Sequence, residues 1–400
     1  MKNNDKIQEL RKIRSRIDWM AQHKINTFSP TIAPAPKSVE RKEIESIYEG
    51  LRYYVRNGVQ DIIVQRKYMG SYCDIYLHKN ADDTYFVSRN GHKIEHINLT
   101  EAKMACEALY DRFDWTDLEI VIIQAELLPW NVLGKGLIEK EFEGYLNAHK
   151  ERMAFLHESS LMDKILKVRS GVAYTTFEKD RKELNTAGFK MKYPAHIVRQ
   201  YNALRDINLP DMAQYTEGIS IFDNQIAHYG KEAALYFKPF NILKKIYTNG
   251  LEEIPNDNRT YQLINDDEMM MVQINSEQEI AEKAACIYEW FASLRQEMEE
   301  GIVIKPVKAF VKGLPPAFKV RNNNYLTMIY GIHFQHELER QIKKRNIRGK
   351  LACSINDWAI NHQLLSIPYR EINPENYHYK NLMLDRIMEE ETESRLDPAL

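Results

Sequence analysis

The sequence has little cysteine, no long apolar run and no excess of charge of either sign. Its four cysteines lie far apart in a chain of 400 residues, without the paired spacing of a zinc site or of a disulfide framework. They are Cys73, Cys106, Cys286 and Cys353. The N-terminal segment 1–24 is polar and charged and lacks the apolar core of a signal peptide. These features favour a protein of the reducing cytoplasm.

Apolar residues nowhere fill the about 18 consecutive positions that predict a membrane-spanning helix, so we expect no membrane association. Lysine and arginine total 55 against 57 aspartate and glutamate, a formal net charge of -2. A nucleic-acid partner would therefore need a locally basic surface. The densest basic run is segment 340–350, which fits either an RNA backbone contact or a solvated helix face.

The spacing of the apolar residues predicts a mixture of helices and strands. With 44% hydrophobic residues the chain can bury a sizeable core, and its length suggests two or three modules. Helical spacing covers segments 7–20, 39–56, 99–113 and 276–299. Strand patterns cover segments 61–66, 72–78, 84–88, 118–127, 218–222, 227–229, 233–238, 260–264, 269–274, 301–305 and 317–320. We expect the first three strands to form an antiparallel meander.

Two long segments have helical character and few strand formers. Residues 136–215 read as an inserted helical module, and residues 325–400 as a helical C-terminal module without the five strands of an OB-fold. The parts between them, 1–135 and 216–324, would together form one core. The sequence thus predicts an α+β fold, with antiparallel sheets and flanking helices.

Lys67 stands where an apolar strand ends in a glycine turn, a position that suits a nucleophile. A lysine amine can attack the α-phosphorus of a nucleoside triphosphate and hold the nucleotide as a phosphoramidate. The attack requires a neutral amine, whereas an unperturbed lysine has a pKa of about 10.4. Three cations further along the chain, Lys305, Lys319 and Arg321, could lower that pKa together with a bound metal, and could also offset charge on the phosphate.

Other side chains near strand ends fit the remaining parts of such a site. Glu126 and Glu300 could hold a hard cation or a ribose hydroxyl, and magnesium is the expected ion because it takes one or two carboxylates plus phosphate oxygens. Arg89 could bind a phosphate of a second substrate through two hydrogen bonds from its guanidinium. Phe237 and Phe240 are the best candidates for an aromatic face against adenine. Each residue taken alone has a plainer explanation, as a solvated or core side chain, but their joint order favours one site.

These residues resemble the motifs of the covalent nucleotidyltransferases, a superfamily that comprises the polynucleotide ligases and the mRNA capping enzymes. The matching segments are Lys67-Tyr-Met-Gly, Glu126, Glu300-Gly-Ile-Val-Ile-Lys305 and Lys319-Val-Arg321. A narrower likeness rests on Lys67-Tyr-Met-Gly-Ser71, Ala125-Glu-Leu-Leu-Pro-Trp130 and Tyr325-Leu-Thr-Met-Ile-Tyr-Gly331. With these segments the chain resembles the ligase domain of bacterial polynucleotide kinase-phosphatase, an RNA repair enzyme.

The resemblance implies a nucleotidyltransferase core and a three-step reaction. ATP would adenylylate Lys67, the AMP would pass to an RNA 5'-phosphate, and an RNA 3'-hydroxyl would displace it. By motif match Glu126 would contact the AMP ribose or a metal, Glu300 the metal, and Lys305, Lys319 and Arg321 the phosphates. Arg89 matches an arginine that such ligases place after the first motif. Mg²⁺ or Mn²⁺ is the implied metal, and kinase, phosphatase and RNA 3'-terminal ribose 2'-O-methyltransferase activities are the implied partners.

The chain departs from the family pattern in two respects. Tyr72 stands where the family usually has an arginine, which leaves one phosphate contact without its usual residue. The chain also lacks the GxxxxGK[ST] pattern of a kinase module. It is therefore expected to be an excised ligase domain or a stand-alone ligase, and Met1 favours the second.

Two other functions fit parts of the sequence. A DNA ligase shares the main motifs, although the missing OB-fold counts against it. A nucleotide- or RNA-binding scaffold that has lost catalysis would explain Tyr72, although the retained lysines and glutamates count against it.

Overall fold

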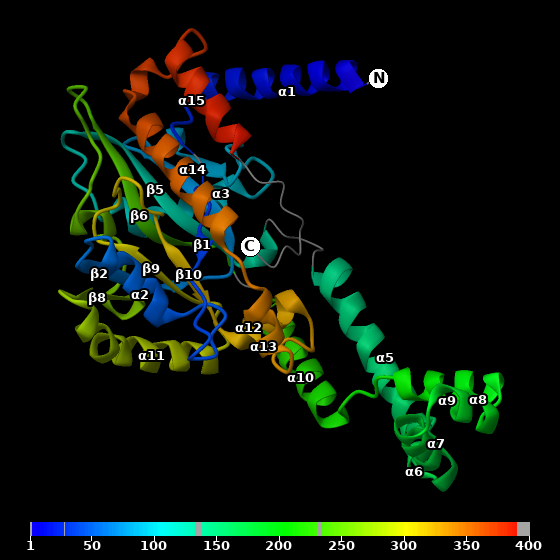
Figure 1. The fold of residues 1–400 in the computed structure, drawn as a ribbon. Helices are drawn as coiled ribbons and strands as arrows, with labels where there is room; N and C mark the ends of the chain where they lie inside the picture. Colours follow the sequence, from blue (N-terminus) through cyan, green and yellow to red (C-terminus); the bar gives the residue numbers. More distant parts are fainter. Residues whose placement is uncertain (1, 28, 133–137, 231–233, 390–400) are drawn as a thin grey trace.

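The computed structural model describes residues 2–27, 29–132, 138–230 and 234–389, which form two sheets surrounded by helices (Figure 1). The first sheet has the strand order β1 (Ala33–Pro34), β10 (Phe318–Arg321), β9 (Gly301–Pro306), β2 (Asp61–Lys67) and β8 (Met269–Gln273). The second has the order β4 (Tyr85–Ser88), β3 (Ser71–His78), β5 (Leu118–Leu128), β6 (Tyr236–Tyr247) and β7 (Glu252–Glu253). Every pairing except β1 with β10 is antiparallel. The predicted α+β class is confirmed.

The first sheet buries one face under two helices, α2 (Ile47–Arg56) and α11 (Ile280–Gln296). In β2, Ile62 and Val64 belong to this core. Because successive side chains of a strand point to opposite faces, Gln65 and Lys67 are directed to the other side of the sheet. The same alternation in β9 directs Lys305 away from the core. A cavity lies on that other side.

The second sheet is covered on both faces. One face packs against α3 (Leu99–Met104) and α4 (Glu107–Tyr110). The other packs against α1 (Lys2–Gln22), α14 (Arg348–Ser366) and α15 (Tyr377–Met388). Buried Lys244 of β6 joins this face to the C-terminal helices, since its Nζ donates to the carbonyls of Leu365 at 2.6 Å and Ile367 at 2.8 Å.

Helices between the two parts of the core extend away from the sheets as an arm (Figure 1). They are α5 (Gly144–Glu158), α6 (Leu161–Ser170), α7 (Val172–Glu183), α8 (Thr186–Lys192), α9 (Ala195–Asp206) and α10 (Met212–Tyr229). The last of them packs on α12 (Asn323–Tyr330). One further helix, α13 (Leu338–Lys344), follows before α14.

Most predicted strands are present, with four corrections. The meander is wrong, because β2 belongs to the first sheet while β3 and β4 belong to the second. Segments 218–222 and 227–229 are helical parts of α10 rather than strands, so the predicted boundary at 215/216 lies inside a helix. Segment 260–264 begins in a 3-10 turn, Asn258–Tyr261. Segment 99–113 forms two short helices instead of one.

The remaining differences concern where elements begin. The helix expected over 39–56 begins at Ile47. The strand expected over 233–238 begins at Tyr236 and continues to Tyr247, and its first predicted residue lies outside the described ones. The C-terminal segment is helical as predicted up to residue 389, and its described part contains no strand.

Candidate active site

A cavity of about 680 Å³ lies between the two sheets, within the range of about 300–1,000 Å³ typical of small-molecule sites. Both sheets, the N-terminal strap at Ser29–Ile32 and helix α14 contribute to its wall. The sequence-predicted site residues that line it are Lys67, Arg89, Glu126, Phe240, Glu300, Lys305 and Lys319. The structure therefore gathers residues that are up to 252 positions apart, from Lys67 to Lys319, around one space.

Lys67 ends β2 and extends its amine toward the cavity. Its Nζ donates to Glu300 Oε2 at 2.8 Å, and the lysine side chain keeps 24% of its surface exposed while the glutamate keeps 4%. The turn after Lys67 needs Gly70, because a Cβ there would lie 2.6 Å from both Glu126 Cγ and the Leu127 carbonyl oxygen. The glycine thus lets the main chain approach the second sheet.

Glu126 lies across this turn from Lys67. The Gly70 N–H donates to its Oε1 at 3.0 Å. Burial raises the pKa of Glu126 to about 7, against the opposing effect of Lys67, and the nearby Glu300 adds to the rise. Two carboxylates therefore converge on one side of the Lys67 amine.

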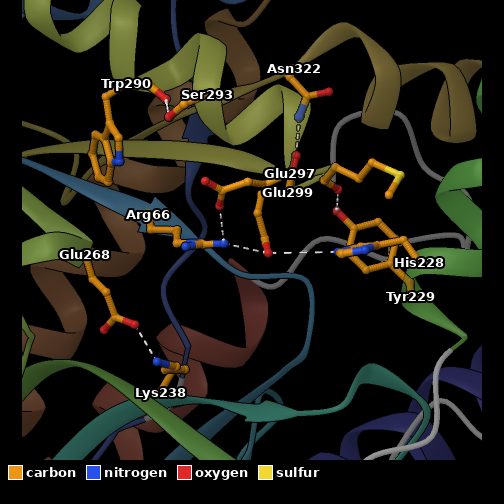
Figure 2. Close-up of polar contacts among 11 residues, drawn as sticks. Arg66, His228, Tyr229, Lys238, Glu268, Trp290, Ser293, Glu297, Glu299 and Asn322 are labelled. Carbon is orange, nitrogen blue, oxygen red and sulfur yellow. Dashed lines mark hydrogen bonds and ion pairs between the residues drawn. The ribbon is translucent and has the colours of Figure 1, made fainter.

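The turn that carries Glu300 is fixed by polar contacts (Figure 2). Arg66 binds Glu297 Oε2 at 2.9 Å and Glu299 Oε1 at 2.7 Å. The Tyr229 hydroxyl donates to the Met298 carbonyl at 2.9 Å, and the Asn322 amide donates to the Glu299 carbonyl. These contacts come from β2, α10 and the residue after β10, so three separate segments hold Glu300 beside Lys67.

Two buried lysines face the cavity from the first sheet. Lys305 donates to Asn241 Oδ1 at 2.8 Å and lies near the rings of Phe240 and Tyr261, and burial lowers its pKa well below the usual value. Burial also lowers the pKa of Lys319, helped by the positive charges of Arg321 and Lys67. An anion in the cavity would favour the charged form of both amines.

The oxygen ligands of the site fit a hard divalent ion better than a soft one. Glu126 and Glu300 supply two carboxylates, and the described residues contain no cluster of three or more His, Cys, Asp or Glu that could hold a metal unaided. Mg²⁺ and ions like it bind one or two carboxylates together with water and phosphate oxygens. A nucleotide would therefore complete the coordination.

A family model described as "PNKP adenylyltransferase domain, ligase domain" matches residues 15–372. The chain belongs to this family. The PNKP ligase family comprises ATP-dependent RNA ligases that use a divalent metal, and this protein is an ATP-dependent RNA ligase that acts by adenylyl transfer. Neither a DNA ligase nor an inactive scaffold is favoured by the match.

Two solved structures are similar to this PNKP ligase over nearly its whole length. One, described as "Structure of Pnkp1/Rnl/Hen1 complex", contains a chain 52% identical, with a TM-score of 0.91, covering 97% of this chain and 99% of that chain. The other, "Structure of the Pnkp1/Rnl/Hen1 RNA repair complex", gives 53% identity, a TM-score of 0.89, and 94% and 96% coverage. No match was found among curated proteins. Within the described residues, no helix has the length and apolarity needed to cross a membrane.

Two of the residues singled out from the sequence of this PNKP ligase do not line the cavity. Phe237 belongs to the core of the second sheet, where it stacks on Phe86 at 5.1 Å between ring centroids. Arg321 is fully buried, and its guanidinium binds Glu45 Oε1 at 2.6 Å. Glu45 also binds Arg345 at 2.8 Å. The Arg321 guanidinium thus contacts a buried carboxylate and does not line the cavity.

The electrostatics of Glu45 follow from these two arginines. Burial alone would raise its pKa, but Arg321 outweighs that effect with help from Arg345 and Lys319, and the pKa is lowered. Glu45 therefore remains charged and links β10 to the segment between α13 and α14.

Arg89 and Tyr72 reach the cavity in different ways. Arg89 is exposed at the rim, in the turn between Ser88 and Gly91. Tyr72 lies deeper, where its hydroxyl donates to Asp74 Oδ1 at 2.6 Å. A neutral phenol bound to a carboxylate does not replace an arginine as a phosphate ligand.

Sequence reasoning missed several lining residues of the PNKP ligase site. They include Gln65, Gln124, Trp130, Asn241, Lys350 and Trp358. Gln124 could have been noticed as the polar residue within the apolar run 118–128. Lys350 ends the basic run 340–350, but nothing in that run points to the cavity, and Trp358 has no local signal. Helix α14 brings both to the cavity through tertiary packing.

Proposed function

We propose that Lys67 is the residue that carries AMP in this RNA ligase. Its Nζ would attack the α-phosphorus of ATP, forming the N–P bond as the bond to pyrophosphate breaks and the amine loses its proton. An RNA 5'-phosphate would then take the AMP, and an RNA 3'-hydroxyl would displace AMP and seal the break. The observation that carries the proposal is that Lys67 Nζ opens into the cavity 2.8 Å from Glu300.

The other residues receive roles from their positions in the cavity. Lys305 and Lys319 would bind the phosphates of ATP, and Phe240 would lie against adenine. Arg89, at the rim, would meet the 5'-phosphate of the RNA, which enters after ATP. Arg321 would act by holding Glu45 and the strand that carries Lys319, rather than by touching a phosphate itself.

Glu126 and Glu300 are the proposed ligands of Mg²⁺ or Mn²⁺. Such an ion supplies positive charge that stabilises the phosphate oxygens in the transition state. Glu300 also holds the Lys67 amine at 2.8 Å, and the amine would have to leave this contact before it attacks.

The neighbours in the RNA repair complexes suggest the setting of the reaction. We propose that this ligase seals RNA breaks whose ends a kinase and a phosphatase have prepared, and that an RNA 3'-terminal ribose 2'-O-methyltransferase works with it. Its four cysteines are free thiols, which supports the cytoplasm as its compartment.

The proposal is tested by incubation with ATP labelled at the α-phosphate and a divalent metal. Wild-type protein should retain acid-stable, hydroxylamine-sensitive label, and Lys67→Ala should retain none. Lys312→Ala, which removes an exposed lysine outside the cavity, should label like the wild type. Absence of label on the wild type would contradict the proposal.

The substrate is tested by sealing assays on nicked and broken RNA and on the same breaks in DNA. We expect the protein to seal only the RNA breaks, or to seal them at a much higher rate than the DNA breaks. Equal rates on DNA would contradict an RNA repair role.

A further inference from the structure

Two buried ionisable groups near the cavity have no ion-pair partner among the described residues. Asp74 of β3 is fully buried, and Lys305 of β9 keeps 5% of its surface exposed. Neither forms a salt bridge within the described ranges, and Asp74 Oδ2 has no hydrogen-bond partner there. Burial disfavours the charged form of each group: it raises the pKa of Asp74 to about 8 and lowers the pKa of Lys305. Both groups therefore depend on hydrogen-bond partners.

A continuous line of hydrogen bonds joins these two groups. Lys305 Nζ donates to Asn241 Oδ1 at 2.8 Å, and Asn241 Nδ2 donates to Gln124 Oε1 at 2.6 Å. Gln124 Nε2 donates to the Tyr72 hydroxyl at 2.8 Å, and that hydroxyl donates to Asp74 Oδ1 at 2.6 Å. We call these five residues, Lys305, Asn241, Gln124, Tyr72 and Asp74, the relay.

The donation from Lys305 sets the direction of every bond in the relay. Lys305 Nζ donates to the Asn241 oxygen, so the Asn241 NH₂ is turned toward Gln124. Gln124 must then turn its oxygen toward Asn241 and its NH₂ toward Tyr72. The tyrosine hydroxyl accepts from Gln124 and has its proton free for the Asp74 carboxylate. A single orientation of each amide therefore allows all four hydrogen bonds of the relay to form.

Strand register places the relay across both sheets. Asp74 is opposite Gln124 in the β3–β5 pair, and Gln124 is opposite Asn241 in the β5–β6 pair. These three residues form a row across the second sheet. The bond from Lys305 to Asn241 then crosses to the first sheet, beside the cavity.

We infer that Tyr72, with Asp74 and the two amides, positions the Lys305 amine for the phosphate of ATP. Tyr72 is a positioning residue in this scheme, because its hydroxyl acts through Gln124 and Asn241 and does not touch the phosphate. The relay holds Asn241 Oδ1 toward the amine. The inference rests on the proposed function, in which Lys305 binds that phosphate.

A simpler role for Tyr72 is to fill space. Its ring lies 6.1 Å from that of Phe240, between centroids, and could serve only as a wall of the cavity. The two roles differ in what the hydroxyl contributes. Tyr72→Phe keeps the ring and removes the hydroxyl, so it separates them.

The experiment measures the single-turnover rate of Lys67 adenylylation at saturating ATP. Tyr72→Phe should lower this rate by roughly tenfold, because loss of the hydroxyl leaves Gln124 and Asp74 without a shared partner. Tyr85→Phe is the matched control, since Tyr85 also binds through a partly buried hydroxyl, to Tyr369 at 3.0 Å, but lies outside the cavity. It should keep the wild-type rate.

A double-mutant cycle tests whether Tyr72 acts through Lys305. In a Lys305→Met background, which has lost the amine, Tyr72→Phe should cause no further loss. A tenfold loss in both backgrounds would overturn the inference, and so would an unchanged rate for a folded Tyr72→Phe protein.

A second pair of variants covers the case in which Tyr72→Phe does not fold. Asp74→Asn keeps an acceptor for the tyrosine hydroxyl, whereas Asp74→Leu removes it. The leucine variant should lose more of the rate than the asparagine variant, and equal losses would contradict the relay. A wild type that never labels would overturn the proposed function itself, which is a different result from a labelled wild type with an unaffected Tyr72→Phe.

Discussion

Lys67 Nζ and Glu300 Oε2 form a 2.8 Å ion pair at the end of β2. Gly301, the residue after this glutamate, is paired with Lys67 between strands β2 and β9. The amine therefore contacts the same carboxylate that is proposed to bind metal. A charged amine has no lone pair for attack on phosphorus. Lys67 must leave this pair before its amine can attack phosphorus.

Replacement of Glu300 tests this separation. Glu300→Gln should lower the adenylylation rate by about 100-fold or more, because it removes a proposed metal ligand beside the reacting phosphate. The rate is measured with labelled ATP at saturating Mg²⁺. Glu297→Gln changes a more exposed carboxylate of the same turn, and a similar loss there would show that the turn rather than the Glu300 carboxylate is responsible.

Glu126 predicts a pH dependence of stability in metal-free protein. Burial raises its pKa to about 7 in the folded state, above its ordinary value of 4.5. The folded state therefore binds the Glu126 proton more tightly than the unfolded state does. The contribution of protonated Glu126 to the free energy of unfolding is fully present below about pH 4.5 and is lost as the pH rises through about 7. Glu126→Gln should therefore raise the melting temperature in EDTA more at pH 8 than at pH 5.

Thermal unfolding at the two pH values measures this difference. Glu119→Gln changes an exposed glutamate of the same strand and should show no such trend. An equal effect of Glu126→Gln at both pH values would refute the assignment of the pH dependence to Glu126.

Glu45 predicts a large loss of stability on neutralisation. Its side chain is fully buried between Arg321 and Arg345, and removal of one member of a buried ion cluster costs about 3–5 kcal/mol. Urea unfolding of Glu45→Gln should show this loss. Glu339→Gln breaks an exposed pair with Lys42 and should cost less than about 1 kcal/mol, and a comparable cost at both sites would contradict the prediction.

The basic run 340–350 divides in the structure into engaged and exposed cations. Arg345 binds Glu45, and Lys350 is buried at the cavity. Lys343, Lys344 and Arg348 are exposed. Their joint replacement by glutamine should weaken RNA binding and reduce its salt dependence by up to about 0.7 in slope per lost phosphate contact, while adenylylation stays intact.

Filter binding at several salt concentrations measures that slope. An unchanged affinity and slope would assign these three cations to a solvated helix face, the other explanation that the sequence leaves open.

The sequence predicted the strands of the site because their signals are local. Segments 61–66 and 118–127 are apolar runs that end at turns, and the structure has them as β2 and β5. Motif order then pointed to Lys67, Glu126 and Glu300, and the structure brings these three together. Their chemical roles remain predictions.

The wrong predictions arose where apolar residues fit both helical and strand spacing, and where a side chain contacts a segment far away in the sequence. Ile219, Phe222 and Ile226 recur at steps of three and four and are buried on α10, but the short run around them also alternates like a strand. Phe240 is the extra residue of a register shift in β6, between Pro239 and Asn241, and it lines the cavity, whereas Phe237 is paired with Leu127 and packs in the core. The partner of Arg321 is a carboxylate 276 positions away, which no local pattern reveals.

The wall of the cavity draws on Ser29 near the start of the chain and on Trp358 near its end. During synthesis the ribosome must therefore pass Trp358 before the wall of this cavity can close. A chain stalled before α14 would have Lys67 in place without the enclosure that α14 provides.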